Sequence, residues 1–254
     1  MRHVTACSLF ALLAFADVWA NGSDPAVKRP LSKPDFDLCQ TRPDTFRFGT
    51  HRYLLSWMTN SSEEEQKLDW IASRNFCRKR CMDTVAVDTP AEWTFLLGAI
   101  RRTTSGATAA AGNEDLAFAV WTSGRLCDFE GCERLDAVKP HSVNGWFWAA
   151  SNQRMSPASC VDGVGNCFHV WSDTGKYGYP QPDNRELRED GLDGNESCLA
   201  VLVDAYNDGA KWHDRACYHR AHFICEDSGI LLNYVRKRAK KIASKKVGNV
   251  QINL

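Results

Sequence analysis

The chain has 254 residues, with 31 Lys and Arg balanced by 31 Asp and Glu, 11% aromatic residues and 11 cysteines. This composition excludes a disordered polar chain, a collagen and a chain that is basic throughout, so we expect no nucleic-acid partner. The length allows one large domain or two small ones. So many cysteines are typical of a protein that folds in an oxidising compartment.

Residues 1–20 have the pattern of a secretory signal peptide. Two basic residues precede an apolar run over residues 4–15, and a cleavage site lies before Asn21. Cleavage after Ala20 removes Cys7 and leaves ten cysteines, an even number that disulfides can absorb. No later apolar run is long enough to span a membrane. We therefore expect a secreted, extracellular protein without a transmembrane segment.

Three Asn-x-Ser sequons are consistent with the secretory route. They lie at Asn21, Asn60 and Asn195. Within the folded domain we expect glycans at Asn60 and Asn195.

Charge is unevenly distributed along the chain. Residues 21–235 carry 23 basic and 30 acidic side chains, whereas the residues after Asp227 include seven basic side chains and no acidic one. We interpret residues 228–254 as a solvated, partly disordered basic tail that binds sulfated glycans or anionic surfaces. The alternative is a tail helix with an apolar stripe on one face, formed by Leu231, Val235, Ala239 and Ile242.

The predicted elements begin after a Pro-rich segment. Residues 21–45 contain four prolines and few apolar groups, which indicates an extended leader. Aromatic and β-prone residues predict a first strand over residues 46–56. Ser61 or Ser62 then caps a predicted helix whose first turn holds three glutamates. One face of this helix carries Trp70, Cys77 and Cys81.

A second helix is predicted over residues 91–101, and a Thr/Ser/Ala/Gly-rich loop insertion follows at residues 103–112. The remaining sequence consists of short apolar segments separated by turn residues. These segments predict strands at residues 117–121, 145–149, 169–172, 198–203, 211–214 and 222–225. Two early helices followed by short strands indicate an α+β domain.

The Cys and Trp pattern of the second half is specific. The stretch from Cys198 reads CLAVLVDAYNDGAKWHDRACYHRAHFICE and resembles the C-terminal half of a C-type lectin-like domain. In that family a cysteine opens a core strand, a Trp-x-Asp motif precedes its partner cysteine, and a last cysteine lies in a Phe-Ile-Cys-Glu-like strand. Earlier parts match in order, at Trp70-Ile71-Ala72, Glu92-Trp93, Trp121-Thr122-Ser123-Gly124 and Gly145-Trp146-Phe147-Trp148.

The resemblance covers residues 46–227 and is strongest to secreted, long-form arthropod C-type lectins. It implies a C-type lectin-like α+β fold, with two helices, short antiparallel strands and long loops, stapled by disulfides. It also implies two disulfides, Cys77–Cys225 and Cys198–Cys217. A local pair, Cys160–Cys167, is expected within one Gly-rich insertion. Three connectivities remain open for the other four cysteines, and we favour Cys127–Cys132 with Cys39–Cys81.

The triplet Gln181-Pro182-Asp183 resembles the sugar-binding motif of the family, in which side-chain oxygens hold a calcium ion. Calcium takes about six to eight oxygen ligands. A cis peptide before Pro182 would turn the side chains of Gln181 and Asp183 toward one point, and X-Pro is the bond at which cis costs least. The resemblance assigns Glu196 and Asp214 as further calcium ligands.

The sequence departs from the family at His213, where the pattern has Asn. The resemblance places His213 in the sugar-binding site, but imidazole is a poor ligand for so hard an ion as calcium. The metal ligands therefore reduce to Gln181, Asp183, Glu196 and Asp214. Protonation of His213 at about pH 6.5 would also put a positive charge beside the cation.

The order of amide and carboxylate in Gln-Pro-Asp implies, in the family, a preference for galactose or N-acetylgalactosamine. Residues 184–195 contain no aromatic ring to stack on such a sugar, so Tyr177, Tyr179 or Tyr206 would have to supply it. The resulting hypothesis is a secreted, calcium-assisted module that binds carbohydrate or glycoprotein in extracellular matrix, cuticle or immune recognition. The alternative is a calcium-independent lectin-like domain that binds protein or matrix partners. No catalytic constellation emerges, so we predict that the chain is not an enzyme.

Overall fold

The computed structural model describes residues 29–104, 117–134, 136, 139–157, 159–161 and 167–248. The predicted signal peptide, the sequon at Asn21 and most of the predicted loop insertion lie outside the described residues. Within the described ranges, no helix combines the length and the apolar character needed to cross a membrane.

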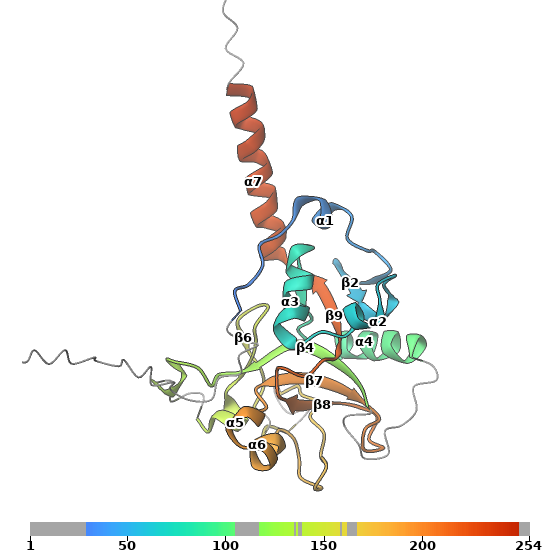
Figure 1. The fold of residues 1–254 in the computed structure, drawn as a ribbon, viewed down its shortest axis with the longest axis vertical. Coiled ribbons are helices and arrows are strands. Elements are labelled where there is room, and N and C mark those ends of the chain that lie inside the picture. Colours follow the sequence, from blue (N-terminus) through green and yellow to red (C-terminus); the bar gives the residue numbers. More distant parts are fainter. Residues whose placement is uncertain are drawn as a thin grey trace, which may run out of the picture.

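The described chain alternates short helices with short strands (Figure 1). The first half forms α1 (Phe36–Gln40), β1 (Phe46–Phe48), β2 (His51–Leu55), η2 (Ser56–Met58), α2 (Glu63–Gln66), α3 (Trp70–Lys79), β3 (Met82–Thr84) and α4 (Pro90–Thr103). The second half forms β4 (Phe118–Leu126), η4 (Cys132–Arg134), α5 (His141–Asn144), β5 (Trp146–Trp148), β6 (Gln153–Arg154), α6 (Arg185–Asp190), η6 (Gly191–Gly194), β7 (Cys198–Val203), β8 (Ala210–Arg215), β9 (His222–Asp227) and α7 (Gly229–Gly248). The predicted α+β class is confirmed.

Strand β9 joins the early and late parts of the chain (Figure 1). It pairs antiparallel with β2 and β3 from the first half and parallel with β4 from the second half. β4 in turn pairs with β5 and β7, and β7 pairs with β8. The strands that carry the later loops are therefore positioned through the last strand of the domain.

Strand β4 is longer than the predicted strand at residues 117–121, since it continues to Leu126. Its register against β7 shifts between Trp121 and Arg125, so the strand is irregular at the Trp-Thr-Ser-Gly motif. An added Cβ at Gly124 would lie 2.6 Å from the Cβ of Leu199. Only glycine fits this close approach of β4 to β7.

The helix predicted to contain Trp70, Cys77 and Cys81 on one face is interrupted. Ser62 caps the short α2, and Asp69 caps a separate helix, α3. Between the two helices, the backbone N–H and C=O of Leu68 bond to Ala221 at 3.0 Å each. The helix is interrupted here because the backbone N–H and C=O of Leu68 form hydrogen bonds with Ala221 instead of within a helix. Cys81 follows α3 with a φ of 59°, so it does not share the helix face with Cys77.

Two predicted strands also differ from the structure. The first strand, at residues 46–56, is a hairpin of β1 and β2, because Gly49 turns the chain with a φ of 56°. The strand predicted at residues 169–172 forms only an isolated bridge, between Trp171 and Trp212. The Trp171 ring packs edge-on against Trp212, with ring centroids 5.8 Å apart. The apolar residues of this segment therefore pack in the core and do not form a further strand of the sheet.

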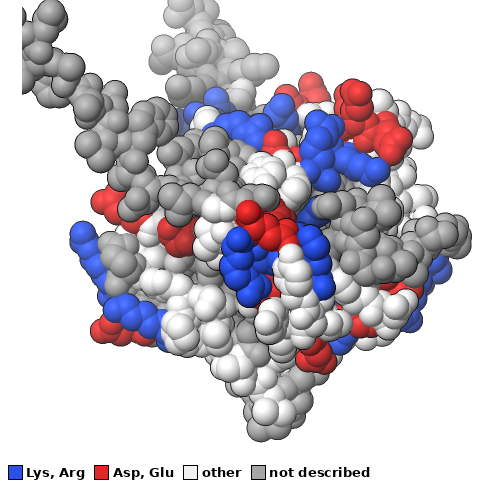
Figure 2. Space-filling model, turned by 60° about the horizontal axis from the view of Figure 1, so that its bottom comes forward, with Lys and Arg blue, Asp and Glu red and all other residues white. Residues whose placement is uncertain are grey.

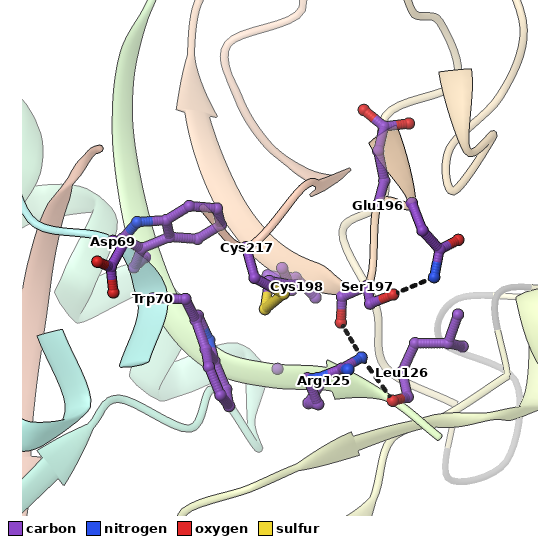
Figure 3. The surroundings of a disulfide bond; sticks show 12 residues. Asp69, Trp70, Arg125, Leu126, Glu196, Ser197, Cys198 and Cys217 are labelled. Carbon is purple, nitrogen blue, oxygen red and sulfur yellow. Dashed lines mark hydrogen bonds between the residues drawn. A yellow bond between two sulfur atoms is a disulfide. The ribbon is translucent and has the colours of Figure 1, made fainter. Parts of the chain in front are cut away.

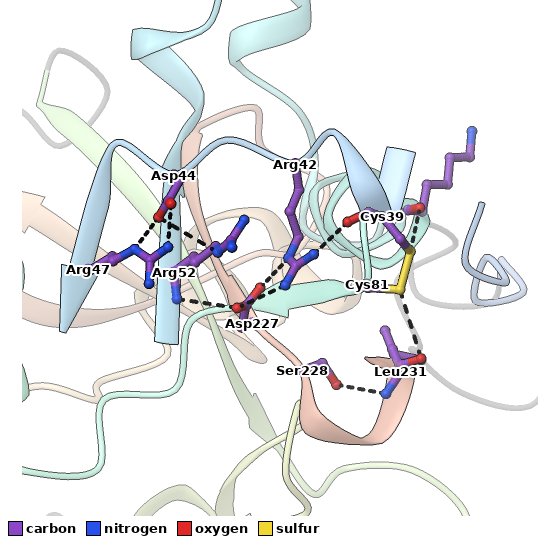
Figure 4. Close-up of polar contacts among 10 residues, drawn as sticks. Cys39, Arg42, Asp44, Arg47, Arg52, Cys81, Asp227, Ser228 and Leu231 are labelled. Atoms are coloured by element: carbon purple, nitrogen blue, oxygen red, sulfur yellow. Dashed lines mark hydrogen bonds and ion pairs between the residues drawn. A yellow bond between two sulfur atoms is a disulfide. The ribbon is translucent and has the colours of Figure 1, made fainter. Parts of the chain in front are cut away.

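The N-terminal leader is attached to the domain. Where residues 21–45 were predicted to be extended, the structure contains helix α1, and Cys39 within α1 is bonded to Cys81. The backbone N–H of Asp35 donates to the carbonyl of Lys79 at 2.9 Å. These contacts hold the described part of the leader against α3 (Figure 4).

The prediction of a partly disordered tail is wrong for its described part, because α7 is a continuous helix that projects from the domain (Figure 1). Leu, Lys, Arg and Ala dominate this segment, and all four favour helices. The first turn is anchored where Leu231, 6% exposed, packs on the Cys39–Cys81 bond. Of the predicted apolar stripe, Val235 is half-buried, whereas Ala239 and Ile242 are exposed.

Five disulfides pair the ten cysteines that follow the predicted signal peptide. They are Cys39–Cys81, Cys77–Cys225, Cys127–Cys132, Cys160–Cys167 and Cys198–Cys217. These are the pairs that the sequence analysis implied or favoured. Cys77–Cys225 encloses the longest segment, with a sequence separation of 148 residues. A bond that closes a long loop restricts the unfolded chain most.

We predict that the Cys77→Ser/Cys225→Ser variant loses about 4–5 kcal/mol of stability or fails to fold. The matched control is Cys127→Ser/Cys132→Ser, whose bond spans a separation of only 5 residues. It should lose about 2 kcal/mol. Chemical denaturation of secreted protein measures both values. Equal losses in the two variants would contradict the role given to the long-range bond.

Candidate functional site

Three carboxylates from separate segments converge at one point. Asp183 is the last residue of the triplet, Glu196 precedes β7, and Asp214 lies in β8. Each offers an oxygen, and these oxygens all lie within 4.8 Å of one another. Glu196 and Asp214 are only 2% exposed. The structure therefore brings together three of the four predicted metal ligands.

Backbone hydrogen bonds hold this arrangement. Asp214 accepts from the backbone N–H of Asp183 at 3.1 Å and from that of Asn184 at 2.7 Å. The side-chain oxygen of Asn184 accepts from the backbone N–H of Glu196 at 2.9 Å. Asn184 has the left-handed φ of 47°, which Asn tolerates better than most residues. Asp214 and Asn184 thus fasten the triplet loop to β8 and to the segment before β7.

The charges in this cluster are costly to bury. The pKa of Asp214 is raised to about 7, mainly by burial and also by the charge of Asp183, although hydrogen bonds from the backbone N–H groups of Asn184 and Asp183 act in the opposite direction. A bound cation would favour the ionised carboxylates. The donor set contains only oxygen atoms, which suits a hard divalent cation such as calcium. By this test the three carboxylates fit a calcium ion.

Arg188 occupies part of the same carboxylate cluster. Its Nη2 donates to Oδ2 of Asp183 at 3.0 Å and to the Asp183 carbonyl at 3.1 Å. The Arg188 side chain is 50% exposed and lies over the ring of Tyr179, 5.4 Å from its centroid. Basic and acidic side chains also lie side by side on the face turned forward in Figure 2. An arginine of the protein itself therefore neutralises Asp183.

Gln181 is placed by the cis peptide that the motif predicted. The Gln181–Pro182 bond is cis, and the backbone N–H of Gln181 donates to the carbonyl of Ser172 at 2.9 Å. Its side chain is buried against Gly175, where an added Cβ would lie 2.5 Å from the Gln181 amide nitrogen. Gly175 therefore leaves the space that the Gln181 amide fills.

His213 is not part of the cluster of three carboxylates. It is fully buried, and its ring stacks on Tyr206 with centroids 5.6 Å apart. Burial lowers the pKa of His213 to about 4. The prediction that it gains a proton at about pH 6.5 is therefore wrong, because desolvation disfavours the imidazolium. The structure does not group His213 with the oxygen ligands, although the sequence placed it in the site.

Of the three tyrosines considered for sugar stacking, Tyr206 packs on His213. Tyr177 and Tyr179 are instead exposed, at 55% and 53%. The Tyr177 hydroxyl donates to Glu189, and this bond is the main cause that lowers the pKa of Glu189 to about 2. The two exposed rings lie in the loop that leads into the triplet.

The start of β7 fixes the position of Glu196 (Figure 3). Arg125 is buried, and its Nη1 donates to the carbonyls of Leu126 and Ser197 at 2.8 and 2.9 Å. The next residue, Cys198, is bonded to Cys217. In Figure 3 the Glu196 side chain points away from this disulfide. The backbone on its C-terminal side is thus held by covalent and hydrogen bonds.

Sequence reasoning missed Arg188 and Asn184. The segment Arg185–Asp190 reads RELRED, and its alternating charges could have indicated a helix with ion pairs at i and i+4. Arg185 and Glu189 form such a pair. No local pattern predicts the contact between Arg188 and Asp183, because Arg188 lies in α6 and Asp183 lies in the loop before this helix.

The two predicted glycosylation sites differ in their surroundings. Asn60 is exposed. Asn195 is half-buried, and its side-chain nitrogen donates to Oδ2 of Asp128 at 2.8 Å and to Oγ of Ser197 at 2.6 Å. A glycan on that nitrogen would disrupt these hydrogen bonds beside Glu196.

No protein-family model and no curated protein matches this chain. Solved structures that are similar to it include the mouse scavenger receptor C-type lectin carbohydrate-recognition domain, with 17% identity, a TM-score of 0.42, and coverage of 72% of this chain and 94% of that chain. The C-type lectin CEL-I from Cucumaria echinata has 17% identity, a TM-score of 0.44, and coverage of 74% and 96%. Human lithostathine has 15% identity, a TM-score of 0.42, and coverage of 73% and 98%.

We predict that a secreted preparation carries an N-glycan at Asn60 and none at Asn195. An Asn60→Gln variant should lose one glycan, seen as a mass decrease and as loss of the mobility shift on enzymatic deglycosylation. Asn195→Gln should leave the glycan mass unchanged. Detection of an N-glycan attached to Asn195 in the folded protein would contradict this prediction.

Proposed function

We propose that this chain is a secreted C-type lectin-like binding module in which Asp183, Glu196 and Asp214 hold a calcium ion that assists carbohydrate binding. The observation that carries the proposal is the convergence of three carboxylates within 4.8 Å, two of them buried. The sequence resemblance over residues 46–227 supports the family. The pairs Cys77–Cys225 and Cys198–Cys217, which that resemblance implied, are consistent with it.

Calcium at this position would supply a coordination centre for sugar hydroxyls, which can complete its oxygen shell. The protein's part is to hold the ligands ready. Asn184 and the buried carboxylate of Asp214 orient the loop, while Asp183 and Glu196 contribute charge. Gln181 remains a proposed ligand on the strength of the motif.

A galactose-type preference is the finer part of this proposal. It rests on the amide-then-carboxylate order of Gln181 and Asp183. The exposed rings of Tyr177 and Tyr179 supply the aromatic surface that such a sugar needs. The sites of action that suit a secreted module of this kind are extracellular matrix, cuticle or immune recognition, and the proposed role is binding without catalysis.

A second candidate function is supported by Arg188. Its guanidinium already neutralises Asp183, and His213 offers no oxygen to replace the family Asn. In this alternative Arg188 serves as the permanent cation of the cluster. The domain would then bind protein or matrix partners without calcium.

We predict that calcium binds the wild-type protein and that Asp183→Asn weakens binding by about tenfold or more, because one charged ligand is lost. The matched control is Asp136→Asn, since the Asp136 side chain is 93% exposed and pairs only locally with Lys139. Arg188→Gln should tighten calcium binding by about three- to tenfold, because a competing cation leaves Asp183. Isothermal titration calorimetry after EDTA treatment measures all four proteins.

Flat calcium titrations for both the wild type and Arg188→Gln would reject the calcium proposal and favour the second candidate. Where calcium does bind, titration with galactose and with mannose, each with and without calcium, tests the sugar preference. Equal affinities for the two sugars would reject the galactose-type assignment.

The basic tail extends the proposal to anionic partners. Helix α7 projects from the domain and carries the basic side chains of the tail. None of its described Lys or Arg side chains forms an ion pair with a carboxylate of the described residues. We predict that removal of residues 236–254 lowers the salt concentration at which the protein elutes from heparin, since seven positive charges are lost.

The control removes residues 249–254 only, which contain no charged side chain. Both truncations should keep the melting temperature of the full chain, because the core contacts of α7 end near Val235. Identical heparin elution of the two truncated proteins would leave the tail without a role in anion binding.

A further inference from the structure

A hollow of about 400 Å³ lies between the leader and the body of the domain. The end of the leader and the first residue of β1, together residues 38–46, form one wall, and β2, η2, residues 59–61 and the end of α3 form the others. The hollow shares no residue with the candidate calcium site. Its volume lies in the range of pockets that bind small molecules, about 300–1,000 Å³.

The wall has an apolar part and a polar part, and the polar part includes Thr41, Thr45, Thr59 and Ser61. The apolar residues that line the hollow include Leu38, Pro43, Phe46, Leu54, Met58 and Phe76. Met58 is 51% exposed, although it is a large apolar side chain. The apolar part of the wall suits the hydrocarbon or aromatic body of a ligand.

Arg80 supplies a cation beside the apolar part of this hollow. It follows α3 directly, between two disulfide-bonded cysteines, Cys77 and Cys81, so its backbone is held on both sides. Its guanidinium lies 3.6 Å over the ring of Phe76, and its Nη1 donates to the Phe76 carbonyl at 3.0 Å. The same side chain also lines a second hollow between α3 and residues 29–32.

The charge of Arg80 is not balanced by a carboxylate among the described residues. Burial lowers the pKa of Arg80, and no neighbouring charge opposes this effect. Arg42, which lines the same hollow, differs: its guanidinium contacts both carboxylate oxygens of Asp227, at 2.7 and 3.4 Å (Figure 4). Of the two arginines that line this hollow, Arg80 is therefore the one whose half-buried charge has no carboxylate partner among the described residues.

We infer that this hollow binds a small organic anion with an apolar body, whose carboxylate or sulfate group pairs with Arg80. The planar guanidinium has several N–H donors beyond the one used by Phe76, and it can bond an oxyanion bidentately. The apolar body would lie against Phe46, Leu54 and Phe76. This site goes beyond the proposed lectin function and needs no calcium.

Decanoate, decyl sulfate and decanol are the probes, each titrated below its micelle concentration into the full secreted chain in EDTA. Decanoate or decyl sulfate should bind and raise the melting temperature, and the tighter of the two identifies the preferred head group. Decanol should bind at least about tenfold more weakly, because it lacks the charge. Asn60 lines the hollow, so the Asn60→Gln protein is titrated as well.

Arg80→Gln should weaken binding of the anionic probes by about tenfold or more and leave decanol binding unchanged. The matched control is Lys79→Gln, which removes an exposed neighbouring cation that does not line this hollow. It should change affinity less than about twofold. Arg80→Lys keeps the charge without the planar fork and should bind with intermediate affinity.

Absence of binding by both the wild type and Asn60→Gln would overturn the inference. So would equal affinity for decanoate and decanol in the wild type, a comparison that needs no variant to fold. Equal weakening by Arg80→Gln and Lys79→Gln would show general charge attraction instead of a built site. Calcium binding is measured separately, so failure of this site leaves the calcium proposal standing, and the reverse also holds.

Discussion

The whole domain depends on how β9 is held. This strand pairs with β2 and β3 from the first half of the chain and with β4 from the second. Within it, Cys225 is bonded to Cys77 of α3 across 148 residues of sequence. A covalent link over such a distance removes much of the entropy that the unfolded chain would gain. The long loops between β5 and β7 can therefore be irregular without loss of the fold.

The candidate calcium site uses this rigidity. β7 pairs with β4 on one side and with β8 on the other, so Glu196, just before β7, and Asp214, in β8, are held by neighbouring strands. The triplet loop has little regular structure of its own, and the buried carboxylate of Asp214 holds it through two backbone N–H groups. One acidic residue thus has two tasks, to anchor the loop and to contribute charge. The same burial that makes the anchor firm raises the pKa of that carboxyl.

The leader and the first turn of α7 meet at a single disulfide. Cys39–Cys81 attaches the leader to α3, and Leu231 of α7 packs on the same bond (Figure 4). The leader forms one wall of the Arg80 hollow, and α7 carries the basic groups outward. The leader and α7 lie outside the segment that resembles the lectin family, so additions to a common scaffold can contribute separate binding surfaces at separate places.

The family resemblance identified the carboxylates of the candidate site. Local chemistry could be determined from the sequence alone: the α+β class, a helix cap at Ser61 or Ser62, and the reversal of charge after Asp227. These features depend on neighbouring residues or on composition. Only the tertiary structure decided that Arg188 neutralises Asp183, that His213 is buried against Tyr206, and that the leader docks on α3. Such contacts join residues that are far apart in the chain, or they join a helix to the loop that precedes it. They depend on the path of the backbone between the elements, which no local pattern encodes.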